Sequence, residues 1–115
     1  MSTTTVYMHA SSAETANGNS GDLGVSNYTE LAVDINITVV SGTTPTCQFF
    51  VDRKDANNVY NPLWQSSSFT ATGSVSTSIG AGLAYAQSLG ATVKLRWVIG
   101  GSSPSFAFSI SIQGK

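Results

Sequence analysis

The stretches Ser41-Gly42-Thr43-Thr44-Pro45-Thr46 and Gly100-Gly101-Ser102-Ser103-Pro104-Ser105 share one pattern: a small residue, Gly, two hydroxyls, Pro and a hydroxyl. Gly admits positive φ, Pro holds φ near about −65° and donates no backbone hydrogen bond, and short hydroxyls bond to nearby backbone. Each stretch therefore predicts a reversal of the chain. We expect two β-hairpins to frame the fold.

Apolar residues with a period of two flank both stretches. Residues 31–40 alternate in this way, and so do residues 93–99 and 106–112 on the two sides of the second stretch. This alternation is typical of half-buried strands, and we expect the last two segments to form the strongest hairpin. Further strands are predicted at residues 4–9, 47–51, 63–69 and 73–79. The pattern indicates an all-β fold, a single antiparallel β-sandwich of jelly-roll or immunoglobulin-like type with about seven or eight strands, or an open barrel.

Two segments lack the alternation. Residues 10–24 are polar and rich in Ser, Asn and Gly, which predicts a long loop or arm that binds something or is mobile. We therefore divide the chain into residues 1–24, an N-terminal strand and polar arm that forms an interface, and residues 25–115, the β-sandwich domain. Residues 80–90 contain alanines between glycines and predict a loop with one helical turn.

The composition excludes several classes of partner. The chain has 115 residues, of which 10% are charged, and its formal net charge is −1. It therefore has no basic track for nucleic acid, and we expect no nucleic-acid partner. No apolar run approaches the roughly 18 residues that span a bilayer, and no secretion signal is visible, so we expect no membrane partner. Ser and Thr account for 18 and 13 residues, which predicts solvated strand faces built from short hydroxyls.

No group of residues predicts catalysis, metal binding or a cofactor. His9 is the only histidine, and we expect a strand-end imidazole that points to solvent or to a neighbour. Asp52 and Asp55 are the closest carboxylates, but their segment lacks the spacing of a calcium loop. Its Ser-rich neighbourhood also does not indicate the water-poor pocket that the general acid of a glycosidase needs. Cys47 is the only cysteine and is expected to be a buried, apolar thiol. Lys94 and Arg96 are expected on an outer strand face, with Asp34 as a cross-strand partner.

Two segments resemble small β-sandwich proteins encoded among the structural genes of tailed bacteriophages. Residues 93–110 read Val-Lys-Leu-Arg-Trp-Val-Ile-Gly-Gly-Ser-Ser-Pro-Ser-Phe-Ala-Phe-Ser-Ile, and residues 31–49 carry Ser-Gly-Thr-Thr-Pro-Thr. In that group a strand of the form Leu-Arg-Val-Arg-Trp leads into Gly-Gly-Thr-Ser-Pro-Ser-Phe. Ser-Gly-Thr-Ser-Pro-Thr lies upstream. The resemblance covers somewhat over half of the chain.

The resemblance implies a non-enzymatic virion protein made in the host cytoplasm. It implies a capsid decoration protein that binds the major capsid protein on the outside of the head and also binds itself, as a homo-oligomer and most simply a trimer. Two alternatives are a tail-tip or fibre module that binds host carbohydrate, with Trp64 and Tyr85 in its pocket, and a tail-tube or connector subunit. The candidate interface residues are Val6, Tyr7, His9, Asn17, Asn19, Phe50, Trp64 and Tyr85.

Overall fold

The protein is described by a computed structural model that covers residues 4–80 and 89–115. These residues form seven strands in one antiparallel sheet. The strands are β1 (Thr4–Glu14), β2 (Gly18–Asn19), β3 (Leu23–Gly24), β4 (Glu30–Lys54), β5 (Tyr60–Gln65), β6 (Gly73–Gly80) and β7 (Thr92–Gly114). The all-β class predicted from the alternating residues is confirmed.

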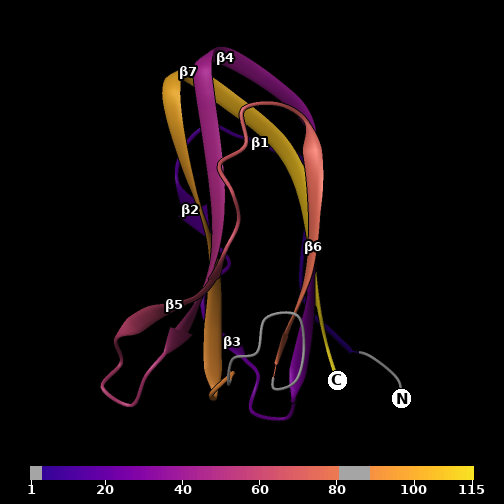
Figure 1. The fold of residues 1–115 in the computed structure, drawn as a ribbon, viewed down its shortest axis with the longest axis vertical. Coiled ribbons are helices and arrows are strands. Elements are labelled where there is room, and N and C mark those ends of the chain that lie inside the picture. Colours follow the sequence, from indigo (N-terminus) through magenta and orange to yellow (C-terminus); the bar gives the residue numbers. More distant parts are fainter. Residues whose placement is uncertain (1–3, 81–88) are drawn as a thin grey trace.

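Two long strands run through the whole fold. β4 has 25 residues and β7 has 23, whereas a typical strand has about 5–6. They pair with each other from Leu31 opposite Gly114 to Arg53 opposite Val93. Both bend near their middles, so the sheet folds over on itself (Figure 1).

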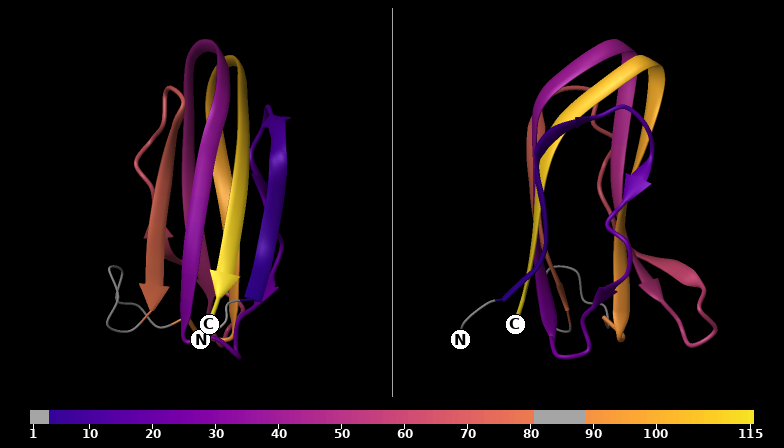
Figure 2. Two further views of the ribbon diagram at one scale, coloured as in Figure 1. Left: turned by 90° about the vertical axis from the view of Figure 1, so that its right-hand side faces the viewer. Right: turned by 180° about the vertical axis from the view of Figure 1, so that it is seen from behind.

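The bend divides the sheet into two halves that face each other (Figure 2). Half-sheet I has the strand order β6, β4, β7, β1, with residues 31–41 of β4 and 105–114 of β7 at its centre. Half-sheet II has β5 at one edge, then residues 46–53 of β4 and 93–100 of β7, and then β2 and β3 at the other edge. This arrangement matches the predicted sandwich, with β4 and β7 contributing to both layers.

The prediction of two hairpins is wrong. Residues 31–41 pair with residues 105–114, and residues 46–53 pair with residues 93–100, so neither Gly-Pro stretch joins two strands that pair with each other. Each stretch instead bends one continuous strand, and the two bends lie side by side, with Thr43 opposite Ser102. Gly and Pro do interrupt the regular backbone pairing of β4 with β7, as expected. The sequence did not reveal that the two interruptions coincide in space.

The two bends, which we call the corner, have the same backbone conformation. Gly42 and Gly101 have φ of 111° and 112°, and the residues two positions later, Thr44 and Ser103, have φ of 47° and 48°. The contact between them is reciprocal. A Cβ on Gly42 would lie 2.7 Å from the carbonyl oxygen of Ser103, and a Cβ on Gly101 would lie 2.7 Å from that of Thr44. Glycine is therefore required at both places by the backbone angle and by the close approach.

The core lies between the two half-sheets. Phe49 of half-sheet II meets Phe108 of half-sheet I edge to face, with ring centroids 5.0 Å apart, and Trp97 meets the same Phe108 at 5.3 Å. Such pairs contribute about 0.5–1.5 kcal/mol beyond the burial of their apolar area. The other fully buried large residues include Leu31, Ile35, Val51, Leu95, Phe106, Ile110 and Ile112.

The N-terminal segment is part of the sheet. The predicted strand at residues 4–9 is present, and β1 extends to Glu14 along the edge of half-sheet I. The predicted arm at residues 10–24 then supplies β2 and β3, which pair with the first part of β7 at the edge of half-sheet II. Residues 10–24 are therefore not a free loop. They were mistaken for one because each strand piece is too short or too polar to show alternation.

The remaining predictions concern the segment between the long strands. β6 matches the expected strand at residues 73–79. β5 begins before the expected strand at residues 63–69 and ends at Gln65, and Phe69 forms an isolated bridge with Cys47. The helical turn expected at residues 80–90 falls mostly on residues 81–88, which lie outside the described residues.

Candidate interaction surface

The outer face of half-sheet II carries a cluster of charged and aromatic side chains. β4 supplies Phe50, Asp52 and Lys54 at alternate positions, and these lie opposite Arg96 and Lys94 of β7. β5 adds Tyr60, which lies opposite Lys54. We call these six residues the charged face.

The centre of the charged face is an ion pair between a partly exposed arginine and a buried carboxylate. Arg96 Nε donates to Asp52 Oδ2 at 2.6 Å, and the Asp52 side chain is only 5% exposed. The Arg96 guanidinium also lies 3.9 Å above the centre of the Phe50 ring, which is a favourable cation–π geometry. The sequence predicted Asp34 as the partner of Arg96, and this is wrong: Asp34 instead accepts a hydrogen bond from Ser76 at 2.6 Å.

A second polar network joins the segment before β3 to β5 and the long strands at the end of half-sheet II. Asp22 accepts hydrogen bonds from the Tyr60 hydroxyl at 2.5 Å and from Lys54 Nζ at 3.1 Å. Lys94 Nζ lies 3.8 Å above the Tyr60 ring. The Tyr60 hydrogen bond, followed by that from Lys54, lowers the pKa of the Asp22 carboxyl, and the same bond to Asp22 raises the pKa of the Tyr60 hydroxyl.

The turn after β4 is organised by one carboxylate. Asp55 Oδ1 accepts hydrogen bonds from the backbone amides of Asn57 at 2.8 Å and Val59 at 3.0 Å. These amides, with that of Val59 first, lower the pKa of Asp55. The arrangement is that of an Asx turn. Among the described residues, no three histidine, cysteine, aspartate or glutamate side chains gather as metal ligands.

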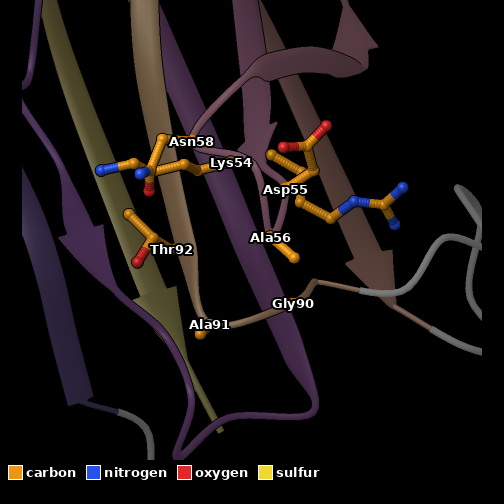
Figure 3. A pocket seen from close by; sticks show the side chains of 8 residues that line it. Lys54, Asp55, Ala56, Asn58, Gly90, Ala91 and Thr92 are labelled. Carbon is orange, nitrogen blue, oxygen red and sulfur yellow. The ribbon is translucent and has the colours of Figure 1, made fainter.

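Two hollows border the charged face. The larger, of about 560 Å³, lies between the turn after β4 and the segment that enters β7, and its lining includes Lys54, Asp55 and Thr92 (Figure 3). The smaller, of about 240 Å³, lies between β2 and β7 and is lined by Asn17, Asn19, Lys94 and Arg96 among others. Both are shallow features of a polar surface, and neither collects a set of groups that could act on a substrate.

The outer face of half-sheet I has a different composition. Its side chains form cross-strand rows, with Ser76, Asp34 and Ser111 in one and Ser74, Asn36 and Ser109 in the next. Ser78, Ala32 and Gln113 form a third row. We call these nine residues the hydroxyl face. Its one charged side chain is Asp34, so the expectation of a strand face built from short hydroxyls is met in this half-sheet.

The predicted interface residues of β1 lie partly against the core. Val6 and Tyr7 are half-buried and pack on it, and burial raises the pKa of the Tyr7 hydroxyl. His9 lies within β1 rather than at its end, and its side chain is 12% exposed. Its Nδ1–H donates to the carbonyl oxygen of Phe108 at 3.1 Å, and its ring stacks on the Phe108 ring. Of the two predicted alternatives, solvent or a neighbour, the contact with a neighbour is confirmed, but the predicted position at a strand end is wrong.

The other predicted interface residues have varied surroundings. Asn17 and Asn19 are exposed, and their side-chain oxygens accept hydrogen bonds from the amides of Ile99 and Gly21, both at 2.8 Å. Phe50 is half-buried beneath Arg96. Trp64 is 7% exposed and belongs to the core, so it cannot form the sugar-stacking surface considered above. Tyr85 lies outside the described residues.

The single thiol is structural. Cys47 is fully buried and free, which confirms the prediction. Burial raises the pKa of its thiol to about 12, so the thiol stays neutral and is a poor nucleophile.

Sequence reasoning missed Asp22, Tyr60 and the burial of Asp52. Asp52 did carry a signal. It occupies an outward position of the alternating pattern, as Arg96 does on its own strand, but the pairing of the two strands that brings these side chains together could not be read from the sequence.

Comparisons with known proteins give one structural neighbour. No protein-family model matches the chain, and no curated protein matches its sequence. Within the described residues, no helix is long and apolar enough to cross a membrane. The structure is similar to the crystal structure of the SPBc2 prophage-derived protein YomS, with 17% sequence identity and a TM-score of 0.48 over 96% of this chain and 91% of that chain. A similarity at this level carries no argument about function.

Proposed function

We propose that this protein is a non-enzymatic structural component of a bacteriophage virion. In this proposal it is a capsid decoration protein that binds the major capsid protein on the outer surface of the head, as a homo-oligomer, and reinforces the shell. The sequence resemblance implies a trimer. No cofactor, metal or nucleic acid takes part.

One observation supports this proposal best. The two stretches that carry the resemblance to phage proteins meet in space and form the corner, where Gly42 and Gly101 each press on the backbone of the other stretch. The shared residues are therefore required by the architecture, because each glycine is fixed by its backbone angle and by its contact. A resemblance located in such residues favours a common fold with a common structural role.

The surroundings of the titratable groups favour a non-enzymatic role. His9 donates to the backbone of Phe108, Asp52 is paired with Arg96, and Asp55 closes its own turn. Each of these side chains has a structural partner, and a general acid or base would need a position facing a substrate.

We place the capsid contact on the exposed side of the N-terminal segment. Met8 on β1 is 73% exposed, the highest value among the exposed large apolar side chains of the described residues. An exposed methionine on an edge strand is suited to contact with another protein. Removing residues 1–24 would not test this, because it would strip the edge strands from both half-sheets. A point substitution is required.

Electron cryomicroscopy of virions that encode this chain tests the proposal. Virions from which the gene has been deleted should lack a density on the outside of the head, and added purified protein should restore it. A density in the tail would contradict a decoration role and would support the tube, connector or fibre alternatives. A virion with no density for this protein would contradict a role as a virion component altogether.

The contact itself can be tested by adding variants to the deleted virions. Met8→Glu should reduce binding at least tenfold. Val98→Glu is the matched control, because Val98 is also exposed, at 39%, but lies on the outer side of half-sheet II. Equal binding by both variants would show that the contact lies elsewhere.

A further inference from the structure

β6 is the one unprotected edge among the described strands. It pairs with β4 in unbroken register, from Gly73 opposite Ile37 to Gly80 opposite Glu30, and with no other described strand. It lies along the side of half-sheet I (Figure 2). Its sequence, Gly-Ser-Val-Ser-Thr-Ser-Ile-Gly, contains no charged residue and no proline. An edge of this kind is a template for pairing with another strand, because its outward N–H and C=O groups have no strand partner.

The other edges carry features that oppose such pairing. β1 has two register shifts along its pairing with β7. β5 contains Pro62 and a register shift beside it, and β2 and β3 have two residues each. Bulges, proline and short length are the devices that blunt an edge strand. β6 has none of these features, whereas β1 has register shifts. Pairing of β6 with β1 of a second copy is therefore less favourable than pairing of β6 with a second β6.

The residues of β6 are complementary to a second copy of β6. We consider two antiparallel copies of β6 related by a two-fold axis perpendicular to the sheet. Residues that lie directly opposite each other in such a pair point to the same face of the sheet. The axis must therefore lie at the level of one residue, which then faces its own copy. With the axis at Thr77, Val75 lies opposite Ile79 of the second copy, and Ser76 lies opposite Ser78. Apolar residues then meet apolar residues on the inner side, and hydroxyls meet hydroxyls on the outer side, both of which are favourable cross-strand pairs.

The core and the charges also suit this pairing. Val75 is half-buried and packs on the core, and Ile79 is fully buried, so pairing would continue the apolar layer across the contact. The nearest charge is Asp34, opposite Ser76 on the neighbouring strand. The two Asp34 side chains would be three strand spacings apart, about 14 Å. This exceeds the Debye length of about 8 Å at physiological salt, so their repulsion is screened.

We propose that two copies of the chain pair through β6 in antiparallel orientation, with the two-fold axis at Thr77, so that half-sheet I continues from one copy into the other. The proposal goes beyond the decoration role and does not depend on it. It assigns a two-fold contact, whereas the family resemblance implies a trimer. Closed two-fold dimers are the commonest oligomers.

The mass of the purified chain in solution is the first test. Light scattering should give twice the 11.9 kDa of the chain, or an even multiple of it. The double variant Ser76→Lys with Ser78→Lys places like charges opposite each other across the axis and should halve the mass.

The matched control for this test is Thr5→Lys with Ser12→Lys, which adds the same charges at exposed positions of β1, the other edge strand of half-sheet I, and should leave the mass unchanged. Circular dichroism of every variant shows whether the fold is kept. A folded double lysine variant of β6 that keeps the wild-type mass overturns the proposal, and so does dissociation by the β1 control.

A mixing experiment separates a lost contact from a damaged strand. Ser76→Glu with Ser78→Glu should also be monomeric alone, but an equimolar mixture with the lysine variant should recover the dimer mass. A mixture that stays monomeric contradicts direct pairing of β6 with β6.

Cross-linking tests the register. Thr77→Cys should form an intermolecular disulfide under oxidation, since a residue on the axis faces itself at about 4.5–5.5 Å between Cα atoms, within the range of a disulfide. Ser74→Cys lies off the axis, opposite Gly80, and should not cross-link. The native Cys47 is buried and does not interfere. A monomer, an odd-numbered oligomer unaffected by β6 variants, or cross-linking at position 74 instead of 77 would each overturn the proposal, whatever the virion experiment shows.

Discussion

The two half-sheets share two strands and one core, yet their outer faces differ. On half-sheet II, the charged face holds an ion pair between Arg96 and the buried Asp52. On half-sheet I, the hydroxyl face has Asp34 as its one charge, held by Ser76. β4 and β7 contribute to both faces. The difference therefore comes from the outward-pointing residues of these two strands, which differ before and after the corner.

This difference shows that the inner and outer positions of one strand are constrained independently. The inner positions carry large apolar residues in both halves because they fill one shared core. The outer positions vary, and the charged face uses its side chains to bind to one another. The hydroxyl face has few such bonds and ends at an unprotected edge, which makes it the better candidate for contact with other chains.

The largest effect should come from breaking the ion pair of the charged face. Arg96→Ala leaves the Asp52 carboxylate buried without its cation, and removing one partner of a buried pair costs about 3–5 kcal/mol. We expect a loss of about 3 kcal/mol in the free energy of unfolding, measured with urea. The matched variant for half-sheet I is Lys115→Ala, which removes the partner of Glu30 at 2.9 Å in a more exposed pair. Lys115→Ala should lower the free energy of unfolding by less than about 1 kcal/mol. Equal losses in the two variants would contradict the difference between the two half-sheets.

The next effect concerns the corner that joins the halves. Gly101→Ala would place a Cβ 2.7 Å from the Thr44 carbonyl oxygen at a φ of 112°. We expect about 2–3 kcal/mol of destabilisation from strain of this kind. Gly24→Ala is the control, since nothing lies within 4 Å of its Cβ position. Thermal unfolding measures both, and an unchanged melting temperature for Gly101→Ala would show that the corner tolerates a side chain.

The shared core should respond to pH through Cys47. Burial raises the pKa of its thiol from 9.0 to about 12 in the folded protein. Below pH 9 both folded and unfolded states keep the proton, and the stabilisation of the neutral form is complete. Above pH 9 the unfolded state releases the proton first, so stability falls as pH rises toward 12. The loss by pH 10 should be roughly 1 kcal/mol. Cys47→Ala should show a shallower decline over this range, and parallel curves would indicate that the thiol is exposed.

The smallest effect lies at the rim of the charged face. Tyr60→Phe removes the hydrogen bond that contributes most to the lowered pKa of Asp22. A hydrogen bond to a carboxylate favours its ionised form, so the pKa of Asp22 should rise toward its ordinary value in an NMR titration. Asp55, whose pKa is lowered by the amides of its own turn, is the internal reference and should not move. A rise at both carboxyls would mean that the substitution disturbs the whole end of the half-sheet.

The sequence was sufficient to locate the long strands. Alternation identified residues 31–40, 93–99 and 106–112 as strands, because burial on one face requires apolar residues with a period of two. The sequence did not predict how the strands pair. A Gly-Pro stretch can reverse a chain or bend it. The outcome here depends on the contacts of Gly42 with Ser103 and of Gly101 with Thr44, and these residues lie far apart in sequence.

The surface was predictable only in part. The solitary Cys47 and the hydroxyl-rich faces followed from composition. The Asp52–Arg96 pair and the network around Asp22 could not be predicted from composition. Each joins residues on different strands, and these residues come close only because of the register in which the strands pair. The N-terminal strand pieces β2 and β3 were missed for a similar reason: two residues cannot show a pattern, and they are held by the neighbouring β7.

The path of β7 also bears on how the protein is made. Residues 105–114 are a central strand of half-sheet I, and their partners lie in residues 31–41, near the other end of the chain. During synthesis, the first part of β4 therefore stays unpaired on that side until residues 105–114 have left the ribosome. Pairing over such distances is slow and leaves strands exposed while it happens. We therefore expect the growing chain to benefit from a chaperone until β7 has been synthesised.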